Sequence, residues 1–163
     1  MKFEIIEKPN DWTKEVKKNK SINETQQKRY DYWVAFEDYA FQNAQFAKNF
    51  NHRKPSSDHW MDFSIGSSAC HITVSQIQKR DELTVELYIN EDKALFNSLL
   101  QHKDDIESKT GLLFDWRELP EKKASRIVVQ QSATLGNQSK WSEQFTWLVD
   151  VMLKMKKEFK KRL

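Results

Sequence analysis

Between residues 59 and 131, apolar and polar side chains alternate along five short stretches, which is the pattern of β-strands with one buried face. The clearest stretch is 83–89, in which aliphatic side chains alternate with Thr84, Glu86 and Tyr88. Short turns at Gly66–Ser68 and Arg80–Asp81 separate the first three stretches, so we expect an antiparallel meander there. The predicted strands cover residues 59–65, 70–75, 83–89, 112–118 and 125–131.

Apolar side chains at three- or four-residue spacing predict three helices. Ser21 and Glu24 fit a capping box at the start of the first helix. Asn90 fits the cap of the second, and Gly111 fits its stop. The predicted helices cover residues 21–48, 91–110 and 141–161. The predicted fold class is therefore α+β: an antiparallel sheet with a βββαββ core, flanked by a long N-terminal helix and a C-terminal helix.

Two segments of unequal size are expected along the chain. Residues 1–20 are expected to form an N-terminal strand and linker, in which Phe3–Glu7 has the pattern of a strand and Pro9 ends it. Residues 21–163 are expected to form a single α+β domain, because 163 residues suffice for one sizeable core.

The first predicted helix carries more aromatic rings than one helix face can bury. Some of them are therefore expected to meet a partner or the far side of the sheet, as in a protein-interaction or homodimerisation domain. These rings belong to Tyr30, Tyr32, Trp33, Phe36, Tyr39, Phe41 and Phe46.

The composition excludes several classes of protein. Cys70 is the only cysteine, so neither a disulfide within the chain nor a cysteine-based zinc site can form. No stretch approaches the ~20 apolar residues of a membrane helix, and the first residues lack the apolar run of a signal peptide. We therefore expect a cytoplasmic protein without a membrane partner.

Positive charge is clustered although the net charge is only +3. The densest cluster is the C-terminal tail, in which Glu158 is the only acid. One interpretation is a solvated helix end whose cations face the helix dipole, and the other is a surface that binds polyanions. The basic residues of the tail are Lys154, Lys156, Lys157, Lys160, Lys161 and Arg162.

Polar side chains share one face of the predicted meander. Two carboxylates with a histidine between them could serve acid–base chemistry or hold a metal, but an antiparallel sheet often leaves one face polar and hydrated. A direct pair of carboxylates is not assured, because the strand of His71 separates those of Asp62 and Glu86. The residues of this polar sheet face are Trp60, Asp62, Ser64, His71, Thr73, Glu86 and Tyr88.

A second candidate site is the basic connection between the last two strands. Lys122, Lys123, Ser125 and Arg126 offer charge and a hydroxyl to a phosphate group, and the alternative is a plain basic turn. Nearby, Trp116 and Arg117 could add a surface for stacking bases.

Known catalytic and cofactor-binding motifs are missing from the sequence. A restriction-type nuclease site needs a lysine two residues after its acid, and Tyr88 stands there after Glu86. Glu91-Asp92-Lys93 has suitable residues but opens a predicted helix, where acids pair with the dipole. We therefore predict no catalytic residue, no metal ligand and no cofactor.

Several motifs, taken in order, resemble domain-of-unknown-function family 4268, a prokaryotic family. The resemblance covers Thr25 to about Lys160. It rests on Tyr32-Trp33-x-x-Phe36, Trp60-Met61-x-Phe63-Ser64-Ile65-Gly66, Glu86-Leu87-Tyr88-Ile89, Asp92-Lys93-Ala94-Leu95-Phe96 and Trp116-x-Glu118-Leu119-Pro120-x-Lys122-Lys123-Ala124-Ser125-Arg126-Ile127.

What the resemblance implies is association with nucleic-acid processing or defence. Members of the family occur alone or after a predicted restriction-type nuclease domain, and Phe3–Trp12 is similar to the joint between those halves. The sequence lacks the nuclease half and its metal ligands, so nuclease activity does not carry over.

Three functions are consistent with the sequence. The first hypothesis is a non-catalytic module that binds the phosphates of DNA or RNA through the basic hairpin and the tail. The second is a domain that binds a nuclease, another protein or a second copy through its aromatic helix. The third is an enzyme with its site on the polar sheet face.

Overall fold

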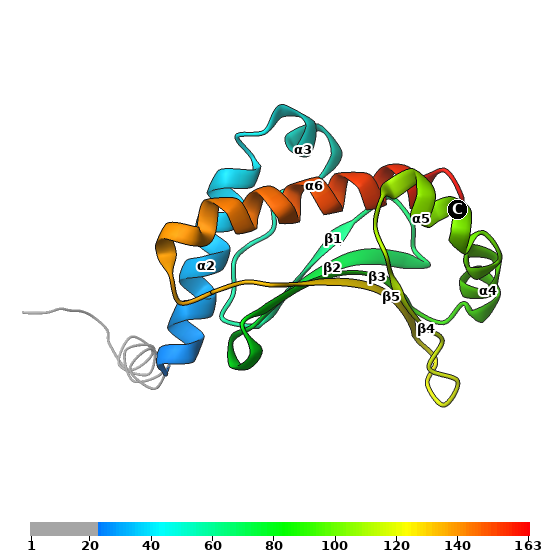
Figure 1. Cartoon of the computed structure of the whole chain (residues 1–163), viewed down its shortest axis with the longest axis horizontal. Helices are drawn as coiled ribbons and strands as arrows, with labels where there is room; N and C mark the ends of the chain where they lie inside the picture. The colour runs from blue at the N-terminus through cyan, green and yellow to red at the C-terminus, as the bar shows by residue number, and fades with distance from the viewer. Residues whose placement is uncertain (1–22) are drawn as a thin grey trace, which may run out of the picture.

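The computed structural model describes residues 23–163, in which five antiparallel strands form one sheet (Figure 1). The order across the sheet is β1-β2-β3-β5-β4, so β5 lies between β3 and β4. The strands are β1 (Trp60–Ser64), β2 (Cys70–Ile77), β3 (Glu82–Ile89), β4 (Asp115–Arg117) and β5 (Ser125–Ser132). The predicted meander and the α+β class are confirmed.

Helices cover one face of this sheet. Figure 1 shows α6 lying along the sheet, with α2, α3 and α5 packed beside it and α4 at the end near β4. The helices are α2 (Glu24–Ala40), α3 (Ala44–Asn49), α4 (Lys93–Gln101), α5 (Lys103–Thr110) and α6 (Trp141–Lys160), with short 3-10 turns η1 (Gln78–Arg80) and η2 (Gln138–Lys140). In the part of the chain that is described, no helix has the length and apolar character needed to cross a membrane.

The predicted first helix is wrong in its extent. Asn23 is the N-cap of α2 and forms the capping box with Gln26, while the predicted cap Ser21 lies outside the described residues. The helix stops at Ala40, because Asn43 leaves the helical conformation and caps α3 by accepting hydrogen bonds from two backbone N–H groups. The predicted strand Phe3–Glu7 also lies outside the described residues.

The predicted second helix is two helices. Asp92, not Asn90, caps α4 by accepting a hydrogen bond from the backbone N–H of Leu95 at 2.9 Å. The chain leaves helical geometry at His102 before α5 begins. Gly111 ends α5 at φ 72°, the left-handed conformation that glycine adopts without strain, so this predicted stop is confirmed.

The rings of α2 are buried mainly within the chain itself. Tyr32, Trp33 and Phe36 are fully buried, and Phe36 packs edge to face against Phe63 of β1 and Phe145 of α6. The buried polar atoms of two of these rings are satisfied: the Tyr32 hydroxyl donates to Gln144 at 2.8 Å, and the Trp33 indole N–H donates to the Asp58 carbonyl at 2.8 Å. These three rings therefore need no partner for their burial.

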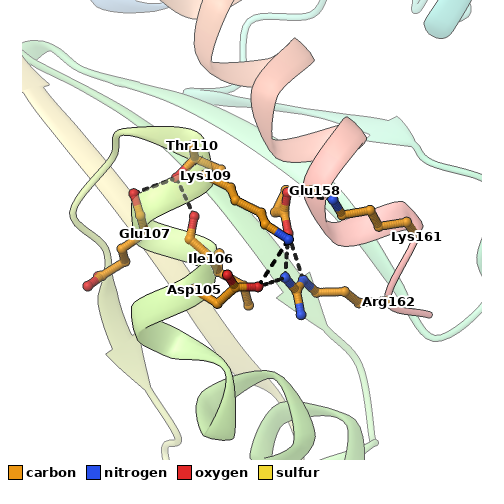
Figure 2. Close-up of polar contacts among 8 residues, drawn as sticks. All are labelled: Asp105, Ile106, Glu107, Lys109, Thr110, Glu158, Lys161 and Arg162. Atoms are coloured by element: carbon orange, nitrogen blue, oxygen red, sulfur yellow. Dashed lines mark hydrogen bonds and ion pairs between the residues drawn. The ribbon is translucent and has the colours of Figure 1, made fainter.

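An ion network joins α5 to the end of α6. Figure 2 shows the Arg162 guanidinium between Glu158 and Asp105. Its Nη2 lies 2.6 Å from a carboxylate oxygen of Glu158 and 2.5 Å from one of Asp105. Glu158 is 5% exposed and also pairs with Lys161 at 3.1 Å. Burial acts to raise the pKa of Glu158, but the hydrogen bonds from Arg162 and Lys161 outweigh burial and hold the pKa below its ordinary value.

We predict that Arg162→Ala lowers the free energy of unfolding by about 1–2 kcal/mol at neutral pH, because buried Glu158 loses a charged donor. The folded-state pKa of Glu158 is depressed, so this contribution is present above the unfolded pKa and disappears as pH falls through the folded value. Urea titrations at several pH values measure the difference. The control Lys154→Ala, which breaks an exposed pair with Asp150, should change stability by less than ~0.5 kcal/mol. An equal loss from both variants would contradict the account.

A second buried carboxylate, Glu37 on α2, has a raised pKa, whereas the pKa of Glu158 is lowered. Its Oε1 accepts the backbone N–H of Arg53 at 2.7 Å, and its Oε2 is buried without a hydrogen-bond partner in the described structure. Burial raises the pKa of Glu37, although the Arg53 N–H and the nearby His52 partly oppose the shift.

We predict that Glu37→Gln stabilises the protein at neutral pH, because the amide keeps the acceptor for Arg53 and removes a buried charge. The folded-state pKa is raised, so the wild-type contribution is present below the unfolded pKa and lost as pH rises through the folded value. The gain of the variant should therefore shrink toward pH ~4. Thermal melts across this range test the prediction, with Asp38→Asn on the exposed side of α2 as the control. A variant that is less stable at every pH would refute it.

Candidate functional site

The sheet face opposite α6 is hollowed into a cleft of about 480 Å³. No helix of residues 23–163 packs over this cleft, and side chains of β1, β2 and β3 form its floor. Its wall is the connection between β4 and β5, which contributes Leu119, Lys122 and Ala124. The cleft thus brings together residues from both sites that the sequence suggests: Trp60, Asp62, His71, Glu86 and Tyr88 from the sheet face, and Lys122 and Arg126 from the basic connection.

Strand register explains why these side chains meet. Asp62 pairs with Thr73 and Thr73 pairs with Glu86, so these three form one row across the sheet. The next row begins at Ser64 and continues through His71, Tyr88 and Arg126 to Arg117. Residues two apart on a strand share a face, so both rows point away from the buried core.

Asp62 of the first row contacts His71 of the second row. The Thr73 hydroxyl donates to Asp62 Oδ1 at 2.7 Å, and His71 Nε2 lies 3.3 Å from the same oxygen. The imidazole also stacks on the Tyr88 ring, with 5.2 Å between ring centroids and 27° between planes. The carboxylate therefore orients the imidazole, and the two stacked rings form a flat, partly exposed surface on the cleft floor.

Glu86 and Arg126 neutralise each other in the middle of the cleft. Arg126 Nη2 donates to Glu86 Oε1 at 2.8 Å, and Nε donates to Oε2 of the same carboxylate, which is a bidentate pair. Glu86 is only 3% exposed. The hydrogen bonds to Glu86 raise the pKa of Arg126, against the effect of burial. Arg126 is therefore a charge-paired residue and not the free cation that the sequence suggests.

Other residues of the predicted phosphate site are engaged elsewhere. Ser125 is fully buried, and its hydroxyl donates to the Glu118 carbonyl at 2.9 Å. Trp116 lies on the helix-covered side, where it packs against Phe96. The Arg117 guanidinium donates to Asp115 at 2.6 Å.

Only the two lysines of the connection keep exposed ammonium groups. Lys122 lies at the wall of the cleft, and Lys123 is 82% exposed with Glu91 4.0 Å away. Lys122 and Lys123 are therefore the residues of the basic connection best placed to meet a phosphate group.

Lys93, whose structural role the sequence does not indicate, fixes this connection. The Lys93 ammonium shares its three N–H groups among four oxygens: the carbonyls of Leu119 at 3.0 Å and Ala124 at 2.9 Å, the Ser125 hydroxyl at 3.0 Å, and the Glu118 carbonyl. Leu119 has φ 55°, a left-handed conformation that costs a non-glycine residue free energy. The contacts span more than 20 residues of sequence, so no local pattern indicates them.

The basic tail lies on the helix layer, away from the cleft floor (Figure 1). The Lys156 ammonium donates to the Asn49 carbonyl, and burial together with neighbouring Lys160 lowers its pKa. Lys160 donates to the Gly66 carbonyl at 3.1 Å. Lys154, Lys161 and Arg162 form ion pairs with acids of α5 and α6. Most of the charge of the tail is thus engaged within the protein.

The donor set of the cleft does not form a metal centre. Within the described range, no three side chains of His, Cys, Asp or Glu lie close enough together to hold a metal ion. What the cleft offers instead is stacking surface, hydrogen-bond acceptors and one flank of positive charge.

Comparison with known proteins gives one match. The model of a family described as "Domain of unknown function (DUF4268)" matches residues 28–163, which is more than half of the chain. No curated protein and no solved structure matches the chain.

We predict that Lys93→Met loosens the β4–β5 connection, because several acceptors lose their donor at once. The free energy of unfolding should fall by about 1–3 kcal/mol. Hydrogen exchange followed by mass spectrometry should show that the variant exchanges faster than the wild type in residues 118–125, with a smaller change in the rest of the sheet. Lys103→Met, which removes an exposed lysine from α5, is the control and should leave this exchange unchanged. Unaltered exchange in the Lys93 variant would contradict the assignment.

Proposed function

The chain belongs to the DUF4268 family, whose description names no function, and we propose that this domain binds single-stranded nucleic acid on the open face of its sheet. The observation that carries the proposal is the exposure of aromatic rings in the same cleft as Lys122. Sheet-borne rings that stack bases, with cations beside them for the phosphates, are a common way of holding a single strand.

Stacking supplies most of the expected affinity. Trp60 is 42% exposed at one end of the cleft floor, and the stacked His71 and Tyr88 rings lie farther along it. A base stacked on such a ring contributes about 1–3 kcal/mol whatever its sequence. Bases of a duplex are already stacked on each other, so these rings favour an unpaired strand.

The charges of the cleft set the direction in which the strand faces. Asp62 repels phosphate but accepts hydrogen bonds from the amino groups of bases. Lys122 and Lys123 lie on the opposite flank and attract the phosphates. The phosphates at one end of the strand are therefore expected to lie against the β4–β5 connection, with the bases over β2 and β1.

A second candidate function is acid–base catalysis at His71. The specific observation is the 3.3 Å contact of its Nε2 with Asp62, which resembles the orienting contact of a general base. Loss of an RNA or DNA substrate on incubation with the protein, abolished by His71→Ala, would favour this candidate. An intact strand after prolonged incubation would exclude it for that substrate.

We predict salt-dependent binding of labelled single-stranded DNA and RNA, with weaker binding of a duplex. Two lysine–phosphate contacts give a slope of log K against log salt of about −1.4, and Lys122→Ala should reduce it by about 0.7. Trp60→Ala should weaken binding by roughly 5- to 100-fold through lost stacking. Fluorescence anisotropy at several salt concentrations measures all three effects.

The exposed Lys103 of α5 again supplies a control, since Lys103→Ala should leave affinity unchanged. Absence of single-strand binding at low salt would overturn the proposal. So would binding that is insensitive to both Trp60→Ala and Lys122→Ala.

A further inference from the structure

A second hollow, of about 560 Å³, lies where the start of β1 and the end of β2 meet the first turns of α2. His59 lines both this hollow and the cleft, so the two are neighbours on the surface. His59 directly precedes Trp60 of the cleft floor, so the hollow adjoins the β1 side of the cleft, across the sheet from the β4–β5 connection. It is lined by Thr25, Arg29, His59, Gln76, Lys79 and Arg80, among others.

Of the described residues, the charged side chains that line this hollow are all basic. Arg80 is engaged with Glu82, whose carboxylate lies 3.1 Å from its Nη2. Arg29 and Lys79 therefore supply the positive charge that an anion in the hollow would meet, and the Thr25 hydroxyl adds a neutral donor.

The Arg29 side chain is only partly buried, and its hydrogen-bonding capacity is not used up within the described residues. Its Nε atom is buried and has no hydrogen-bond partner in the described part of the protein. An unpaired charged donor is costly, and native structures usually satisfy one with water, an ion or another partner.

The backbone around Arg29 is held in place. The side-chain amide of Gln76, fully buried at the end of β2, donates to the Arg29 carbonyl at 3.1 Å. The Gln78 amide in turn donates to the Gln76 side-chain oxygen at 2.7 Å. This chain of hydrogen bonds fixes the first turns of α2 against the sheet, so the hollow is preformed.

We propose that this hollow is a second phosphate site, and that a strand bound in the cleft continues past Trp60 and His59 to reach Arg29 and Lys79. The inference rests on the proposed function of the cleft. It predicts a track with cations at both ends and rings between them. The eight residues of β2 span about 25 Å at ~3.3 Å per residue, which is the scale of a site for several nucleotides.

The test combines oligonucleotide length with substitution of the second site. Labelled oligothymidylates of roughly 4 and roughly 12 nucleotides bracket the track, because the shorter one fills the cleft alone. With the longer probe, the double variant Arg29→Gln/Lys79→Ala should bind roughly five- to tenfold more weakly and show a salt slope smaller by about 1.4. With the shorter probe it should bind as the wild type does.

Two controls keep the outcomes distinct. Lys28→Ala removes an exposed lysine next to Arg29 and should change neither affinity. Lys79→Ala alone, in the exposed η1 turn, repeats the test without disturbing α2 and should give about half of the loss in salt slope.

The two proposals fail in different ways. If neither probe binds the wild-type protein, both the proposed function and the second phosphate site are refuted. If both probes bind and respond to Lys122→Ala, but the longer one is insensitive to the double variant, only the second phosphate site is refuted. Equal weakening of both probes would also refute it, because the short strand should not reach Arg29.

Discussion

Burial of one sheet face beneath α6 and α2 determines where the other features of this protein lie. The aliphatic side chains of β2 and β3 point into that interface, and Phe36 joins β1 to α6 there. Strand side chains alternate in direction, so the same packing turns the rows of Asp62 and His71 outward. The cleft is therefore a consequence of the core, and its floor is as rigid as the strands that carry it.

Charge in the cleft is largely balanced, and this shapes what it can bind. Buried Glu86 and partly exposed Arg126 neutralise each other, and Asp62 is engaged by Thr73 and His71. Among the described residues, positive charge without an ion pair remains at the margins, on Lys122 at one end and on Lys79 beyond the other. Rings and hydrogen-bond acceptors occupy the space between. Such a surface suits a strand whose bases face the protein better than one held by its phosphates alone.

Local sequence patterns predicted much of this structure, because alternation and capping are local effects. The strands, the final helix and the stop at Gly111 follow from such patterns, and the suspected family is confirmed by the family model. Local patterns do not predict contacts between residues that lie far apart in the sequence. Long-range packing places β5 between β3 and β4 and pairs Arg126 with Glu86. It also buries Ser125 and brings the Lys93 ammonium to the carbonyls of the β4–β5 connection. The sequence thus indicated the residues of the cleft but not which of their charges remain free.

Chemical-shift mapping tests the central claim most directly, because it locates a bound strand without prior choice of a variant. In a ¹⁵N-labelled sample titrated with an unlabelled single-stranded oligonucleotide, the indole signal of Trp60 and the backbone amides around His71, Tyr88 and Lys122 should shift together. The indole signals of Trp33 and Trp116, on the covered side, should stay in place. Shifts confined to the α6 tail or to α2, with the Trp60 signal unmoved, would show that the open sheet face is not the binding surface.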